Sequence, residues 1–109
     1  MAWREVVPSS SKLQVSLSAD GLLGHHGDAV QLVRSDRVLI QLLLDRRPDP
    51  IREHELKHIL WPKLIPSAYA YRTRLVRIRR QLGSVGLALR FRDRVGYTLE
   101  ESAGFAPPR

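Results

Sequence analysis

Hydrophobic positions follow two different spacings along this chain. Near the start, short apolar runs alternate with polar residues, and Val15 and Leu17 are examples. A period of two is typical of strands with one buried face. An antiparallel meander of three or four strands is therefore predicted over "WREVV", "LQVSLS", "GLLGHH" and "DAVQL", with a hairpin turn at Asp20-Gly21.

After residue 34 the apolar spacing changes to three and four, which is typical of helices that bury one face. A first helix is predicted over "SDRVLIQLLLD", with Ser35 as its N-cap. Its apolar stripe is expected to consist of Val38, Leu39, Leu42 and Leu43. The sequence "RRPDP" ends this helix, because proline disrupts helical hydrogen bonding.

Two further helices are predicted over residues 51–60 and 67–82, on either side of the loop "PKLIPS". The last of them is the clearest element of the chain, and Gly83 supplies its stop. Its apolar ridge is narrow, so most of its surface is expected to be exposed. The ridge consists of Tyr71, Leu75, Ile78 and Leu82.

A β-hairpin is predicted over "LALRFRDRVGYTLE". Leu87, Leu89 and Phe91 fall on one side of its first strand, and Arg90 and Arg92 fall on the other. The "DR" that follows marks the turn. The hairpin is therefore expected to have one buried face and an arginine-rich tip.

One α+β domain with a modest core suits a length of 109 residues and a hydrophobic content of 43%. We expect an N-terminal strand or extension over residues 1–12, the domain over 13–100 and a flexible tail over 101–109. The absence of cysteine excludes disulfides and zinc sites with cysteine ligands. No apolar run in the sequence approaches the length of a membrane span, so the default expectation is a cytoplasmic protein.

The net charge of +7 is concentrated in one segment. Residues 72–94 contain eight arginines and one acidic residue, whereas the rest of the chain has ten basic and ten acidic residues. A local cationic surface predicts a polyanionic partner, with nucleic acid first, and the alternative is a solvated face that only aids solubility. The eight are Arg72, Arg74, Arg77, Arg79, Arg80, Arg90, Arg92 and Arg94.

The predicted elements follow the order of a winged helix-turn-helix: a helix, a short helix, a turn, a long basic helix and a basic hairpin. An α-helix fits the DNA major groove, where arginines bind phosphates or guanine and an apolar side chain can meet a thymine methyl group. Arginines of the hairpin would reach the adjacent minor groove. The residues predicted to bind DNA are Arg72, Thr73, Arg74, Val76, Arg77, Arg79, Arg80, Arg92 and Arg94.

The predicted helices and hairpin resemble, in order and sequence, those of a known family, the winged-helix effector domains of OmpR/PhoB-type response regulators. The resemblance covers about residues 13–99 and rests on "DAVQLVRSDRVLIQLLLDRRPD", "IREHELKHILW", "YRTRLVRIRRQLG" and "LRFRDRVGYTL". It implies a transcriptional regulator with a four-stranded N-terminal sheet, three helices and a C-terminal hairpin wing. By position, it implies DNA contacts from Arg74, Arg77 and Arg79.

The resemblance also implies a protein contact. The loop over residues 61–67 matches a segment that some members of the family present to RNA polymerase. Its candidate contact residues are Lys63, Leu64 and Ile65.

The chain departs from the family pattern at several positions. The family commonly has an acidic residue at the position of Arg72. At the positions of Asp93 and Arg94 it commonly has an arginine followed by a glycine. Family members usually carry an amino-terminal phosphorylatable receiver domain, for which this chain has no room. We therefore expect an orphan regulator, an isolated effector domain of a larger protein, or a winged helix reused for protein contact.

Residues 54–58, "HELKH", match the H-E-x-x-H motif of zinc peptidases. Helical geometry places His54 and His58 opposite the apolar face of their helix, so both are expected to face solvent or DNA. No third ligand has a suitable spacing, and Lys57 would repel a nearby dication. A zinc peptidase is therefore a minor alternative, and no catalytic residue, metal or cofactor is predicted.

The remaining aromatic and histidine residues are expected to be structural or solvent-exposed. His25 and His26 lie near a turn with their rings expected in solvent, although they could titrate. Trp61 and Tyr97 are expected to pack against the core instead of stacking on bases. Tyr69, which points outward, remains a candidate contact to a sugar or phosphate.

The leading hypothesis is a cytoplasmic, nucleoid-associated regulator that binds double-stranded DNA. Binding as a homodimer or as tandem copies is compatible with this sequence. The alternative from a different class is a protein-interaction module that docks on RNA polymerase or another regulator.

Overall fold

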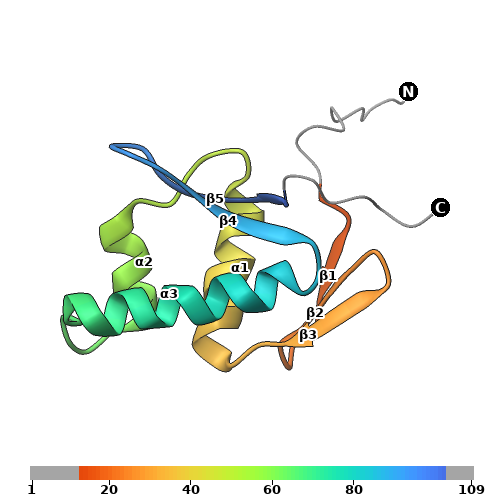
Figure 1. Cartoon of the computed structure of the whole chain (residues 1–109), viewed down its shortest axis with the longest axis horizontal. Coiled ribbons are helices and arrows are strands. Elements are labelled where there is room, and N and C mark those ends of the chain that lie inside the picture. Colours follow the sequence, from red (N-terminus) through yellow and green to blue (C-terminus); the bar gives the residue numbers. More distant parts are fainter. Residues whose placement is uncertain (1–12, 103–109) are drawn as a thin grey trace.

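The computed structural model describes residues 13–102, and residues 1–12 and 103–109 lie outside the described part. The described chain is a small α+β domain with three helices, a three-stranded sheet and a separate two-stranded hairpin (Figure 1). Its strands are β1 (Val15–Leu17), β2 (Leu22–His25), β3 (Asp28–Gln31), β4 (Leu87–Arg92) and β5 (Gly96–Glu101). Its helices are α1 (Arg34–Arg46), α2 (Glu53–Leu60) and α3 (Ala68–Gly83).

The predicted N-terminal meander is confirmed for three strands, which pair antiparallel in the order β1-β2-β3. Asp20-Gly21 lies in the turn between the first two, as expected. Gly21 has a φ of +97°, and a Cβ there would lie 2.6 Å from the carbonyl oxygen of Leu32. Only glycine fits this close approach. The expected strand "WREVV" lies outside the described residues.

Helix α1 differs from the prediction at its start and on its buried face. Its N-cap is Val33, so the prediction of Ser35 as the cap is wrong. Val38 was expected in the core but is exposed, and Ile40 is buried in its place. The reason is that the buried face contains a charged residue, Asp36, which an apolar pattern passes over.

Helix α2 begins two residues later than predicted because Ile51 belongs to a β-bridge. The Ile51 amide donates to the Tyr97 carbonyl at 2.9 Å, and the Tyr97 amide donates back at 2.8 Å. Helix α3 matches its prediction closely. Ser67 caps it by accepting a hydrogen bond from the Ala70 amide at 3.0 Å, and Gly83 is its last residue.

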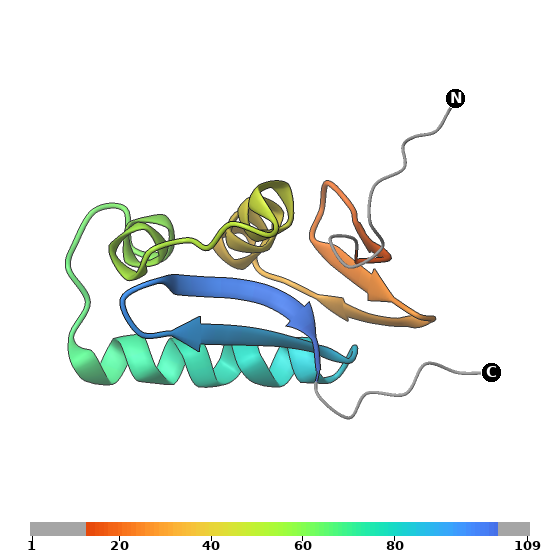
Figure 2. The same ribbon diagram turned by 90° about the horizontal axis from the view of Figure 1, so that it is seen from above.

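The hairpin β4-β5 lies between the helices. Figure 2 shows α3 on one side of it and α1 with α2 on the other, and α3 contacts β4 while α1 contacts β5. Leu87, Leu89 and Leu99 bury the inner face, whereas Phe91 is only partly covered. Strand β5 continues to Glu101, one residue into the segment expected to be a tail. No helix within residues 13–102 is long and apolar enough to cross a membrane.

Candidate nucleic-acid interface

Helix α3 is held against the domain by a narrow apolar ridge. Leu75, Ile78 and Leu82 are buried, and Tyr71 at the start of the ridge is partly buried. The Tyr71 hydroxyl hydrogen-bonds the Tyr97 hydroxyl of β5. Burial, with this hydrogen bond, raises the pKa of Tyr71 above its ordinary value, so the Tyr71 hydroxyl keeps its proton at physiological pH. The rest of the helix is therefore held outward at a fixed orientation.

Most of the residues predicted to bind DNA are exposed on α3 and the hairpin tip. Val76 is 53% exposed although it is apolar. Tyr69 is also exposed at the first turn. The other exposed members of the predicted set are Arg72, Thr73, Arg77, Arg79, Arg80, Arg92 and Arg94.

Arg74 is the exception among the predicted DNA contacts. Its side chain is 17% exposed, and it donates to the fully buried Asp36 carboxylate at 2.9 and 3.2 Å. It also donates to the Ser35 hydroxyl and lies 5.5 Å from the Trp61 ring. The guanidinium therefore joins α3 to α1 and to the end of α2. These contacts make Arg74 a residue that positions α3.

Arg77 is in an intermediate position. Its side chain is 51% exposed, and one guanidinium nitrogen lies 3.5 Å from the second oxygen of Asp36. This contact is long for a hydrogen bond. Arg77 can therefore reach a ligand, but Asp36 offsets part of its charge.

The hairpin tip carries the second group of arginines. Its turn closes with a hydrogen bond from the Val95 amide to the Arg92 carbonyl at 3.0 Å. Arg94 has a φ of +65°, the left-handed region that glycine favours. A charged side chain therefore occupies a backbone position that glycine ordinarily favours. The first turn of α3 and the hairpin tip lie toward the same end of the molecule (Figure 1, Figure 2).

The arginines differ in whether an acid neutralises them. Arg90 pairs with Glu100 across the hairpin at 2.9 Å, and Arg74 and Arg77 share Asp36. The other five form no ion pair with any described residue. These five unpaired arginines are Arg72, Arg79, Arg80, Arg92 and Arg94. Arg79 donates one long hydrogen bond, of 3.4 Å, to the carbonyl of Leu89.

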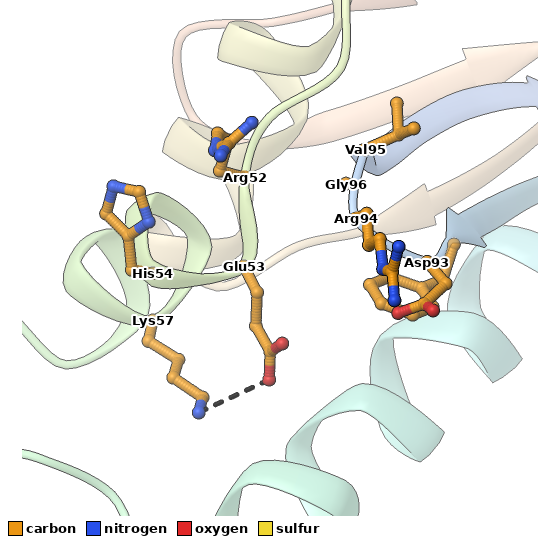
Figure 3. Close-up of a pocket in the computed structure, with 9 residues that line it drawn as sticks. Arg52, Glu53, His54, Lys57, Asp93, Arg94, Val95 and Gly96 are labelled. Atoms are coloured by element: carbon orange, nitrogen blue, oxygen red, sulfur yellow. Dashed lines mark ion pairs between the residues drawn. The ribbon is translucent and has the colours of Figure 1, made fainter.

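A pocket of about 450 Å³ separates the start of α2 from the hairpin tip (Figure 3). Arg52 and Lys57 line the pocket on the side of α2, and Arg94 lines it on the side of the hairpin tip. Two acids, Glu53 and Asp93, line it as well, and Glu53 pairs with Lys57 at 3.3 Å. The pocket therefore has a mixed charge and lies beside the arginines of the tip.

The loop before α3 exposes apolar side chains. Leu64 is 63% exposed and Ile65 is 93% exposed, beside the exposed Lys63. Burying such residues against a partner removes apolar surface from water. The structure thus presents all three predicted partner contacts to solvent.

The H-E-x-x-H segment is arranged differently from a zinc peptidase site. His54 and His58 are exposed, as predicted, and belong to no group of three metal-ligating side chains among residues 13–102. Glu55, the residue that would activate water, accepts from Arg46 at 2.8 and 3.1 Å. It also accepts from the Arg52 amide at 3.3 Å, which caps α2.

The contacts of two buried residues were not identified from the sequence. Asp36 was assigned only to the first turn of a helix, and its pairing with Arg74 spans 38 positions. His25 was expected in solvent, but it is 2% exposed, so that prediction is wrong. Its side chain lies between the sheet and the base of the hairpin, against Val85 and Glu101. No local pattern in the sequence signals either contact.

No family model, curated protein or solved structure matches this chain. Arguments about its function therefore begin from the side chains described above, and in particular from the unpaired arginines of α3 and the hairpin tip.

Proposed function

We propose that this chain is a winged helix-turn-helix protein that binds double-stranded DNA and regulates transcription. Helix α3 would enter the major groove, and the hairpin tip would contact the adjacent minor groove or its phosphates. The resemblance of the sequence to OmpR/PhoB-type effector domains supports this proposal. The element order and the antiparallel hairpin beside α3 are compatible with it.

The observation that carries the proposal is the grouping of the five unpaired arginines. A protein without a polyanionic partner gains little by leaving this many guanidinium groups unpaired within 23 residues of sequence, while it pairs other arginines with acids such as the buried Asp36. Guanidinium groups bind phosphate and guanine in a bidentate manner. Val76 and Thr73 lie among them and offer contacts to base edges.

Arg80 provides the sharpest test because it is exposed and forms no ion pair with a described residue. Binding of a fluorescein-labelled random duplex is measured by anisotropy at low salt. Arg80→Ala is expected to weaken binding by about 1–3 kcal/mol, or roughly fivefold to 150-fold. Arg77→Ala is less direct, since Arg77 also contacts Asp36.

Arg90→Ala is the matched control, since it removes the same charge from an arginine that Glu100 already neutralises. It should weaken binding much less than Arg80→Ala. Equal effects of the two substitutions would mean that net charge, and not this face, determines binding. Absence of duplex binding by the wild-type chain would remove the proposal.

The exposed loop favours a second candidate function, a protein-interaction module. Ile65 and Leu64 are the kind of apolar residues that a partner such as RNA polymerase would cover. In that case the arginines would engage an acidic protein surface. No duplex binding at low salt, with the fold intact, would favour this candidate over the first.

A further inference from the structure

Three potential metal ligands converge at the base of the hairpin, far from the arginine-rich tip. His25 and His26 each place Nε2 near one oxygen of Glu101, at 3.2 and 3.3 Å. The three ligand atoms all lie within 4.8 Å of one another, and no other such group occurs within the described residues. Glu101 pairs with Leu87 at the opposite end of the hairpin from Arg92 and Gly96. The cluster therefore lies at the end of the hairpin opposite the arginine-rich tip.

The fold brings the two histidines together at a tight turn. His26 and Gly27 link β2 to β3, and both have positive φ, of +51° and +88°. Two such residues form the type I′ turn that closes a two-residue hairpin. Neighbouring residues of a strand point to opposite faces, but this turn places the two imidazole centroids 4.3 Å apart.

A backbone hydrogen bond sets the tautomer of His25. Its Nδ1 lies 2.6 Å from the Val85 carbonyl oxygen, and a carbonyl only accepts, so Nδ1 carries the proton and donates it. In the neutral ring with this tautomer, Nε2 directs a lone pair at the Glu101 carboxylate, 3.2 Å away. A cation bound between the two groups would be attracted by both. Metal-binding histidines generally donate their second ring N–H to a carbonyl in this way.

We propose that His25, His26 and Glu101 bind one Zn²⁺ ion. Zinc binds imidazole nitrogen and carboxylate oxygen at about 2.0–2.2 Å, which in a tetrahedron separates the ligand atoms by about 3.3 Å. The observed separations of 3.2 and 3.3 Å match that edge. The protein supplies three ligands, and water or another donor would complete the tetrahedron.

The ion would act as a clamp between distant parts of the chain. Glu101 is 76 positions from His25, so the site exists only when the sheet and the hairpin are both in place. Because zinc then binds the folded state in preference to the unfolded state, it should raise the midpoint of thermal unfolding. This inference does not depend on DNA binding.

The test uses the double variant His54→Ala/His58→Ala, which removes an exposed histidine pair whose i, i+4 spacing also suits a zinc ion. Titration calorimetry of this chain with zinc chloride should show one ion per chain, and zinc should raise its unfolding midpoint. Adding Glu101→Gln should lower the zinc affinity by at least about tenfold. His26→Asn should do the same, since asparagine tolerates the positive φ and preserves the turn.

Circular dichroism before zinc is added verifies that each variant is folded. Undiminished zinc binding in both folded ligand variants would overturn the assignment of the site. A parent chain that binds no zinc once His54 and His58 are replaced would overturn it as well, because adventitious binding would then account for any zinc bound by the wild type.

Discussion

Asp36 is the residue on which the orientation of α3 depends most. Its carboxylate is fully buried on α1 and receives Arg74 and, more distantly, Arg77. A buried carboxylate would be costly if it were unpaired, and its pairing with Arg74 offsets that cost. Because of this contact, Arg74 holds α3 in place, whereas the other arginines of the helix remain available to a ligand.

Asp36→Ala should lower the free energy of unfolding by about 2–4 kcal/mol, because it leaves Arg74 largely buried without its carboxylate. Urea denaturation followed by circular dichroism measures this difference. Glu53→Ala is the control, since it breaks an exposed pair with Lys57 and should cost less than about 1 kcal/mol. Equal losses in the two variants would contradict a special role for Asp36.

At the scale of elements, the junction between α1 and α2 depends on the glutamate of the H-E-x-x-H segment. Glu55 joins the last turn of α1 to the first turn of α2 through Arg46. The Arg46 guanidinium, followed by the Arg52 amide, holds the pKa of the Glu55 carboxyl below its ordinary value of 4.5. The motif therefore has a structural explanation that requires no metal.

This lowered pKa predicts how the junction depends on pH. A carboxyl whose pKa is lower in the folded state contributes stability above its unfolded pKa, and that contribution is lost as the pH falls. Glu55→Gln should therefore be less stable than the wild type at pH 7, and the difference should begin to shrink near pH 4.5 and vanish only once the pH falls below the lowered pKa of the folded state. Thermal unfolding of both proteins from pH 7 to pH 3 measures the difference. A gap that stays constant over this range would contradict the role of the ionised carboxylate.

The spacing of apolar residues predicted the elements better than it predicted their contacts. The ridge of Leu75, Ile78 and Leu82 was identified because helical periodicity depends on local sequence alone. The pairing of Asp36 with Arg74 could not be predicted, because spacing shows which face a residue occupies and not which distant residue it meets. For the same reason His25 was placed in solvent, although β5 and Val85 cover it.

At the scale of the whole molecule, charge is distributed unevenly. Among the described residues, acids neutralise arginines that hold elements together, as at Arg46, Arg74 and Arg90, and leave five unpaired on α3 and the hairpin tip. The zinc cluster that we propose lies at the other end of the hairpin. The molecule would thus use α3 and the hairpin tip for a polyanionic ligand and the hairpin base to fasten its sheet to β5.

The salt dependence of duplex DNA binding tests the central claim most directly. If the five unpaired arginines each neutralise one phosphate and release its counterion, the logarithm of the binding constant should fall with the logarithm of salt concentration with a slope of about −4.5. Arg80→Ala should reduce the steepness by about 1, and Arg90→Ala should leave it nearly unchanged. A slope near zero, or no duplex binding at the lowest salt concentration, would contradict the account.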